Sequence, residues 1–169
     1  MSISYHQLAV TGYLRALDNL DHLLDKAIEH VQARKLDERA LLDARLFPDM
    51  FPLSRQIQMV SVMTANGVAW LIGKETPQFE NTETTFAALK RLLAQTAEFL
   101  KSVKESDFAD SANREVRLPW KPNEPLRGEV FLLQHSIPNV YFHLTTAYDI
   151  MRHNGVEIGK ADYLGKIAG

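Results

Sequence analysis

The first 34 residues show the most regular alternation of hydrophobic and polar positions in the chain. Apolar residues recur there at intervals of three and four, which places them on one side of an α-helix. This stripe consists of Val10, Tyr13, Leu17, Leu20, Leu24, Ala27 and Val31. Charged residues occupy the opposite side, so the pattern predicts an amphipathic helix over residues 4–34.

Two further segments have the same helical period. The first covers residues 53–72, and its stripe consists of Ile57, Val60, Thr64, Gly67 and Leu71. The second covers residues 82–104, and its stripe consists of Phe86, Leu89, Leu93, Ala97, Leu100 and Val103. Asn81 or Thr82 is predicted to cap this helix, with Glu83 at the positive end of its dipole.

The segments between these helices have the composition of loops. Residues 35–52 contain Pro48 and Pro52, which predicts a loop with one helical turn. Residues 105–127 are polar and contain three prolines. Val116, Leu118 and Trp120 alternate with polar residues there, so a short extended ribbon is expected but not a full sheet.

A fourth helical segment resumes near Gly128. Pro138 must end or kink it, because proline lacks an N–H group and clashes with the preceding turn. We expect the next helix to begin at Ser136 or Ile137 and to end at Gly155, with Val156 packing back on the last turn.

Four long helical segments with little strand signal predict an all-α fold, an up-and-down four-helix bundle formed by residues 1–169 as a single domain. The connections after the first and third helices are about 20 residues long. Loops between helices usually have about 2–8 residues, and long connections are often functional.

Composition narrows the function classes. The chain is 46% hydrophobic and 24% charged, with a net charge of −2 and a pI of about 6.3, which argues against nucleic acid as a partner. It has no cysteine, which excludes disulfides, zinc–thiolate sites and a cysteine nucleophile. No signal peptide or membrane span is recognisable, so a cytoplasmic location with no membrane partner is expected.

The fourth helix has one polar stripe, which contains most of the candidate functional residues. The stripe consists of Asn139, His143, Thr146, Ile150 and His153. Such a stripe can face water, line a cavity or meet a partner. His143 could therefore be a buried, hydrogen-bonded histidine, a ligand-binding or metal-binding residue, or an exposed one.

Other polar residues have structural and functional interpretations. Asp49 and Gln56 could stand at the mouth of a pocket; alternatively, Asp49 caps the second helix and Gln56 satisfies nearby backbone groups. His135 and His153 are expected to be structural. The sequence NGVEIGKA does not meet the spacing of a phosphate-binding loop, and no Ser–His–Asp arrangement is evident.

Three segments resemble a family of uncharacterised bacterial proteins that is grouped with the DinB/YfiT-like metalloenzymes. They are FPDMFPLSRQIQ (residues 47–58), PNVYFHLTTAYDIMRHNGV (138–156) and IGKADYLG (158–165). The resemblance covers nearly the whole chain. It implies a four-helix bundle that forms a homodimer.

The resemblance also implies a place for a metal. DinB-like proteins hold zinc or nickel with three histidines, one on the second helix and two on the fourth at H-x-x-x-H spacing. Here Asn139 and His143 occupy the two fourth-helix positions, and residues 53–72 contain no histidine. The chain therefore departs from the triad at two of three positions, and no firmly bound cofactor is expected.

Three hypotheses follow. The leading one is a bundle with a degenerate metal site that binds a small molecule or a partner as a homodimer, using Asn139, His143, Gln56, Thr146 and Asp49. The alternative is a zinc- or nickel-dependent transferase or hydrolase in which His143 is one ligand and His135 or His153 replaces a missing one. The third makes the polar stripe a dimer interface.

Overall fold

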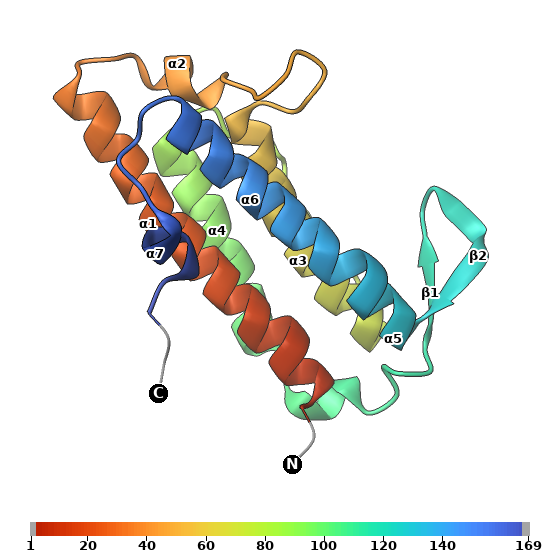
Figure 1. Ribbon diagram of the computed structural model, residues 1–169. Coiled ribbons are helices and arrows are strands. Elements are labelled where there is room, and N and C mark those ends of the chain that lie inside the picture. The colour runs from red at the N-terminus through yellow and green to blue at the C-terminus, as the bar shows by residue number, and fades with distance from the viewer. Residues whose placement is uncertain (1–2, 167–169) are drawn as a thin grey trace.

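Four long helices lie side by side along most of the molecule (Figure 1). The structure is a computed structural model that describes residues 3–166. The long helices are α1 (Gly12–Ala33), α3 (Leu53–Ile72), α4 (Phe86–Ser102) and α6 (Ile137–His153). All four predicted helices are thus present, and the bounds of α3 match the prediction at both ends.

Shorter elements connect or extend these helices. They are the π-helical turn η1 (Gln7–Thr11), α2 (Glu38–Leu42), the 3₁₀ turn η2 (Glu105–Phe108), α5 (Gly128–Val130), the π-helical turn η3 (Phe131–Ser136) and α7 (Lys160–Leu164). The predicted helical turn in residues 35–52 is α2. The expected ribbon is the hairpin of β1 (Glu115–Leu118) and β2 (Lys121–Arg127), which pair antiparallel and project from the bundle (Figure 1).

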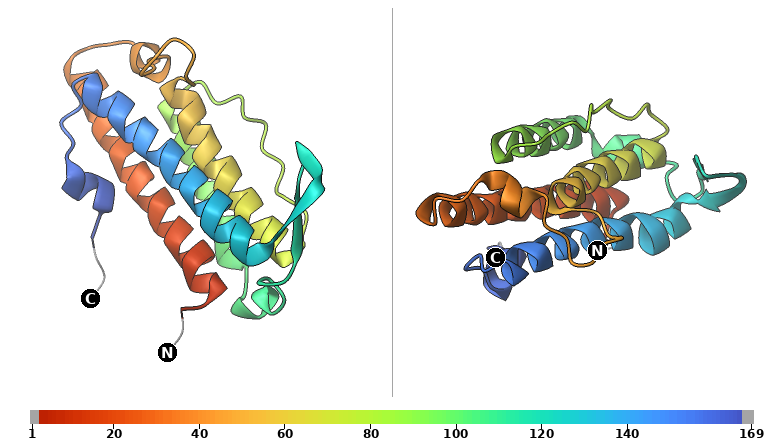
Figure 2. Two further views of the ribbon diagram at one scale, coloured as in Figure 1. Left: turned by 45° about the vertical axis from the view of Figure 1, so that its right-hand side comes forward. Right: turned by 90° about the horizontal axis from the view of Figure 1, so that it is seen from above.

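The directions of the helices differ from the up-and-down order predicted from the sequence. Both α3 and α4 begin at the same end of the bundle, where Gln58 Nε2 donates to the carboxylate of Glu83 at 3.0 Å. Both end at the hairpin side, where Lys74 pairs with Asp107 at 3.1 Å. Residues 73–85 therefore return along the whole bundle before α4 starts (Figure 2). The two helices run parallel, so the prediction of alternating directions is corrected.

The start of the third long helix is also corrected. It begins at Phe86 rather than at residue 82, and its cap is Thr85, whose Oγ1 accepts from the Ala88 N–H at 3.2 Å. Glu38 of α2 accepts the N–H of Phe86 at 3.0 Å, which ties α2 to the same helix end. Asn81 instead adopts a left-handed backbone conformation, with φ of 54°.

Pro138 neither ends nor interrupts the fourth helix. The helical backbone continues from α5 through η3 into α6, and Ser136 at the junction keeps helical dihedrals (φ −66°, ψ −55°). A π-helical turn holds one extra residue per turn, which accommodates the missing N–H of Pro138 near the first turn of α6. The predicted end is confirmed, because Gly155 has φ of 88° and the Val156 N–H bonds back to the Met151 carbonyl.

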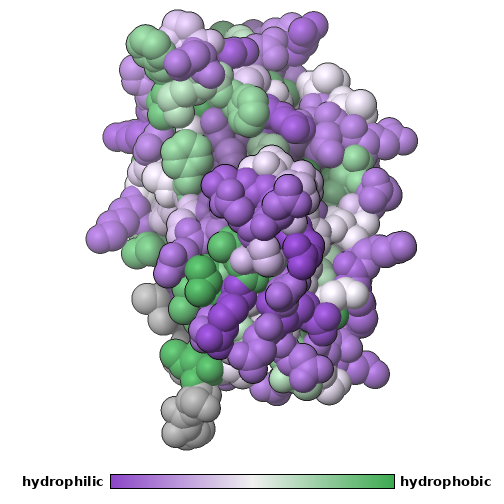
Figure 3. Space-filling view, turned by 90° about the vertical axis from the view of Figure 1, so that its right-hand side faces the viewer, coloured by the Kyte–Doolittle hydropathy of each residue, from purple (hydrophilic) through white to green (hydrophobic). Residues whose placement is uncertain are grey.

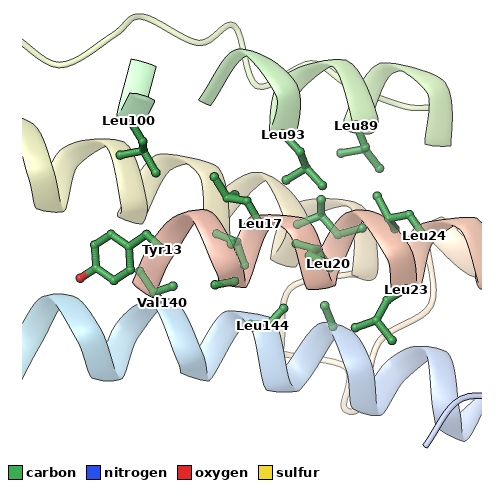
Figure 4. Packing of buried hydrophobic residues seen from close by; sticks show 14 of the residues in the cluster. Tyr13, Leu17, Leu20, Leu23, Leu24, Leu89, Leu93, Leu100, Val140 and Leu144 are labelled. Carbon is green, nitrogen blue, oxygen red and sulfur yellow. The ribbon is translucent and has the colours of Figure 1, made fainter. Parts of the chain in front are cut away.

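The core fills the space between α1, α3, α4 and α6 with aliphatic side chains (Figure 4). One polar contact is buried within it, between Tyr13 Oη and Ser136 Oγ at 2.6 Å. Gly67 lets α3 approach this pair, because a Cβ at that position would overlap Ser136 Oγ. The packing fixes α3 against α6, which is where the candidate site lies. None of the helices in the described part of the chain is long and apolar enough to cross a membrane.

Candidate functional site

The N-terminal part of α3 and the middle of α6 bring Gln56 and His143 together. Gln56 lies in the first turns of α3 and is 1% exposed, and His143 lies on the opposing face of α6 and is 7% exposed. Their side chains meet with Gln56 Oε1 2.7 Å from His143 Nδ1. Two residues that the sequence separates by 87 positions thus form one buried polar pair.

A second hydrogen bond fixes the orientation of this pair. Gln56 Nε2 donates to the backbone carbonyl of Phe51 at 3.2 Å, so Oε1 is the amide atom that faces the imidazole. An amide oxygen can only accept, and therefore Nδ1 of His143 must carry the ring proton. In the neutral ring this leaves Nε2 with a lone pair, as a hydrogen-bond acceptor.

Nε2 of His143 is the free end of this arrangement. It makes no hydrogen bond within residues 3–166. Three side-chain atoms in this part of the chain are both inaccessible to solvent and without a hydrogen-bond partner: Ser61 Oγ, Asn81 Oδ1 and Arg114 Nε. Nε2 of His143 is not among them. Solvent therefore reaches Nε2 through the small exposed edge of the ring.

The surroundings keep the imidazole uncharged. Burial, and to a smaller extent the nearby positive charge of Arg55, together lower the pKa of His143 to about 4. At neutral pH the imidazole therefore stays uncharged, and its unprotonated Nε2 can accept a hydrogen bond. A ligand group that donates a hydrogen bond is the natural partner of Nε2.

Arg55 is held next to this pair by polar side chains rather than by an acid. Its Nη1 donates to Gln58 Oε1 at 3.1 Å, and Gln58 in turn donates to Glu83. The guanidinium lies 5.7 Å from the centre of the Phe51 ring, within the range of a cation–π contact. No carboxylate within the described residues forms an ion pair with it.

Two exposed aromatic rings border the site. Phe142 is 56% exposed and packs edge-on against His143, with ring centres 5.3 Å apart. Phe51 is 48% exposed, and its backbone carbonyl holds Gln56. One exposed ring thus packs against the imidazole, and the other lies beside Arg55.

The other predicted site residues are placed at different depths. Asn139 is half-buried one turn before His143, and it makes no side-chain hydrogen bond in the described structure. Thr146 is buried, and its Oγ1 donates to the Phe142 carbonyl at 2.7 Å. Both lie on α6 with His143, but only Gln56 is bonded to it.

Asp49 lies apart from this pair, on an exposed turn before α3. The alternative that Asp49 caps this helix is wrong, because the N-cap is Pro52 and no side chain bonds to the helix end. The alternative for Gln56 is confirmed in part, because Gln56 does satisfy a backbone carbonyl.

The two other histidines considered as ligands do not converge with His143. His135 is half-buried between Phe131 and Trp120, with ring centres 5.7 Å away on either side, and burial lowers its pKa. His153 is exposed in the last turn of α6. Across residues 3–166 no three His, Asp or Glu side chains are grouped closely enough to hold a metal ion.

The residues at the implied metal position do not suit zinc or nickel. Gln56, Asn139 and His143 supply one imidazole and two neutral amides, whereas such sites use about three firm nitrogen or oxygen ligands. The amide of Gln56 is already committed to the Phe51 carbonyl and to His143. The amide oxygen of Gln56 therefore accepts from His143 and is not free to serve as a metal ligand.

Sequence reasoning missed Phe51, Arg55 and Phe142. The only signal for them was position: Phe51 and Arg55 flank Pro52 and Gln56, and Phe142 precedes His143. Aromatic residues next to polar ones at a helix start are ordinary, so the pattern alone could not single them out.

Several hollows of the surface lie away from His143. One of about 390 Å³ lies between α1 and α4 and is lined by Leu14, Leu17, Leu93 and Ala97 among others. Another of about 650 Å³ lies between α1 and α7 and is lined mainly by charged residues. Neither hollow is lined by His143 or Gln56.

Comparison with known proteins supports the resemblance. Residues 5–164 match the family described as "Domain of unknown function (DUF1993)". A crystal structure of a DinB family member protein from Shewanella denitrificans is 40% identical to the chain, with a TM-score of 0.93. That match covers 96% of this chain and 92% of the other. No curated protein matches the sequence.

Proposed function

The chain belongs to the DUF1993 family and has the fold of a DinB family protein, and we propose that it binds a small molecule at His143 and works as a homodimer. The observation that carries this proposal is the hydrogen-bond chain from the Phe51 carbonyl through Gln56 to His143. It fixes the imidazole in one tautomer and leaves Nε2 as an unpaired acceptor.

The preorganisation of the acceptor supports a binding role. Gln56 is fully buried, and its amide is held at both ends, so the position of the imidazole is fixed before any ligand arrives. Fixed polar groups surrounded by apolar surface are typical of small-molecule sites. Phe51 and Phe142 supply that apolar surface here.

The homodimer is supported by the distribution of exposed apolar side chains. Ten large hydrophobic residues are exposed in the described structure, and seven of them lie on the loop before α3, on the hairpin, on η3 or on α6. These seven, which we call the aromatic face, are Leu46, Phe47, Phe51, Trp120, Leu133, Tyr141 and Phe142. Figure 3 shows several apolar side chains on the left of that view, interspersed with hydrophilic ones. Large exposed apolar patches often mark protein–protein contacts.

A second copy on the aromatic face would also cover the His143 site. Phe51 and Phe142 belong both to this face and to the border of the site. A dimer would therefore enclose a ligand that a single copy holds only from one side. This links the two parts of the proposal.

The test is a fragment-binding experiment on the whole chain. We expect NMR signals from the His143 ring to shift with a subset of fragments, and these fragments to stop binding when His143→Leu removes the acceptor. The matched control is His153→Leu, on the exposed end of the same helix, which should bind as the natural protein does. Fragments that bind equally well to both variants, or no fragment that shifts the ring signals, would contradict the proposal.

Elemental analysis supplies an independent test. Protein dialysed against a chelator should hold much less than one equivalent of zinc or nickel, because the donor set at His143 does not suit either metal. A full equivalent that survives chelation would instead favour the metal-dependent alternative.

A further inference from the structure

Arg55 places a positive charge without an acidic partner beside His143. Arg55 directly precedes Gln56 on α3 and lies close enough to His143 to affect the imidazole electrostatically. Its one hydrogen bond goes to the neutral amide of Gln58, through Nη1. The remaining N–H groups of its planar fork are available to a ligand.

The start of α3 adds to this positive potential. The helix is 20 residues long, its N-cap is Pro52, no side chain caps its exposed amides, and no acid lies in its first turn. The positive end of the helix dipole is therefore not neutralised by the protein. Arg55 lies in this same first turn, so the charge and the dipole act at one place.

The two polar ends of the site demand different chemistry. Arg55 favours a carboxylate or another oxyanion, which can accept two parallel hydrogen bonds from a guanidinium. Nε2 of His143 has a lone pair and would repel the same oxyanion, so it needs a hydroxyl or N–H donor. The exposed ring of Phe51 lies 5.7 Å from the Arg55 guanidinium, and the exposed ring of Phe142 lies 5.3 Å from the His143 ring.

We propose that the ligand is a small aromatic acid, with its anionic group on Arg55 and a hydroxyl or amine that donates to Nε2 of His143. This inference rests on the proposed function, because it names the ligand class of the same site. The unpaired charge of Arg55 and the unpaired lone pair of His143 together set the orientation of the ligand. The aromatic part of the ligand stacks against Phe51 and Phe142.

The experiment compares small hydroxylated aromatic acids with their methyl esters, beginning with 4-hydroxybenzoate and methyl 4-hydroxybenzoate. The ester keeps the ring and the hydroxyl but loses the charge. Dissociation constants are measured from the shifts of the His143 ring signals in the natural protein and in two variants. Arg55→Gln removes the charge but can still donate to Gln58, and Arg91→Gln is the control, because Arg91 is exposed on α4.

We expect each acid to bind at least about tenfold more tightly than its ester, since a hydrogen bond to a charged group is stronger than a neutral one. Arg55→Gln should remove this preference, and Arg91→Gln should keep it. If acid and ester bound equally, or if the preference for the acid survived Arg55→Gln, the proposed ligand class would be wrong, but a small-molecule site at His143 would still stand. If neither acids, esters nor other fragments shift the ring signals, the proposed function itself fails.

Discussion

Gln56 determines the state of His143 more than any other residue does. Its amide is oriented by the Phe51 carbonyl, and it therefore accepts from Nδ1 rather than donating to it. From the sequence, Asn139 and Gln56 were both candidates to share a site with His143. Only Gln56 is bonded to it, and helix spacing alone could not choose between them, because it does not reveal contacts between helices that are distant in the chain.

Lowering the pH should destabilise the protein through His143. The pKa of this ring is about 4 in the folded state and about 6.5 in the unfolded chain, so only the unfolded chain takes up a proton between these values. The stabilisation is complete above pH 6.5 and is lost as the pH falls towards 4, up to roughly 3 kcal/mol. Urea unfolding at pH 7 and pH 5 measures the larger part of this loss.

Two variants separate the contribution of the His143 ring to this pH dependence from the contributions of other groups. In His143→Gln the difference in unfolding free energy between the two pH values should shrink by about 2 kcal/mol, whereas His153→Gln should leave it unchanged. The lowered pKa values of Asp107 and Asp162 matter only at still lower pH. An unchanged pH dependence in His143→Gln would show that the ring is not held neutral.

Ser61 should be a site where a smaller, apolar residue stabilises the fold. Its hydroxyl is fully buried in α3 and has no hydrogen-bond partner, so folding removes it from water without compensation. Ser61→Ala should raise the unfolding free energy by roughly 0.5–1.5 kcal/mol.

Ser111 is the matched control, because it is equally buried but donates to the Leu71 carbonyl at 2.8 Å. Ser111→Ala should lower the unfolding free energy by about 1 kcal/mol, since the carbonyl loses its partner. Thermal or urea unfolding that shows both variants shifted in the same direction would disagree with the assigned hydrogen bonds.

At the scale of single elements, the start of α4 shows what the sequence could and could not predict. Asn81, Thr82 and Thr85 are all good N-cap residues, and the apolar stripe begins at Phe86. The choice among them depends on Glu38 of α2, which accepts from the Phe86 N–H and thereby fixes the first turn. A contact between distant segments therefore decides a boundary that looks local.

This cap can be tested with two threonines three residues apart. Thr85→Ala should lower the unfolding free energy by about 1 kcal/mol, because the Ala88 N–H loses its acceptor. Thr82→Ala should change it very little, since residue 82 lies in the exposed connection before the helix. If both substitutions lowered the unfolding free energy equally in urea unfolding, the assignment of Thr85 as the sole cap would be contradicted.

The connection between α3 and α4 also shows what the sequence could not predict. Residues 73–85 are 13 residues in length, and an extended chain of that size spans about 40 Å, more than the roughly 30 Å of a 20-residue helix. The segment is thus long enough to return to the start of α3. The sequence indicated a loop here, but its periodicity carries no information on the direction of the helix that follows.

For the molecule as a whole, the hydrophobic stripes were sufficient to predict four helices, one helical turn and a small ribbon. They could not predict the parallel pair α3 and α4, because each stripe states only that a face is buried and not against which neighbour. The exposed apolar residues follow the same logic. Which of them lie near one another depends on the packing of segments that are distant in the chain.

The oligomeric state should depend on this aromatic face. Sedimentation of the natural chain should show a dimer, and Phe142→Glu should shift it to monomer, because a buried unpaired charge at an apolar contact is costly. Leu36→Glu is the control, since Leu36 is similarly exposed but lies after α1, outside the aromatic face. A natural chain that sediments as a monomer, or a Phe142→Glu variant that remains dimeric, would contradict the homodimer proposed here.

The central claim is that His143 is a neutral acceptor, oriented by Gln56, at the position where the resemblance to DinB-like proteins implied a metal ligand. Nitrogen NMR of the imidazole in chelator-treated protein tests it most directly. The account predicts a proton on Nδ1 and a lone pair on Nε2 from pH 8 down to pH 5, with no metal shift of either signal. A proton on Nε2, a charged ring at pH 6, or an Nε2 signal shifted by a metal that survives chelation would contradict it.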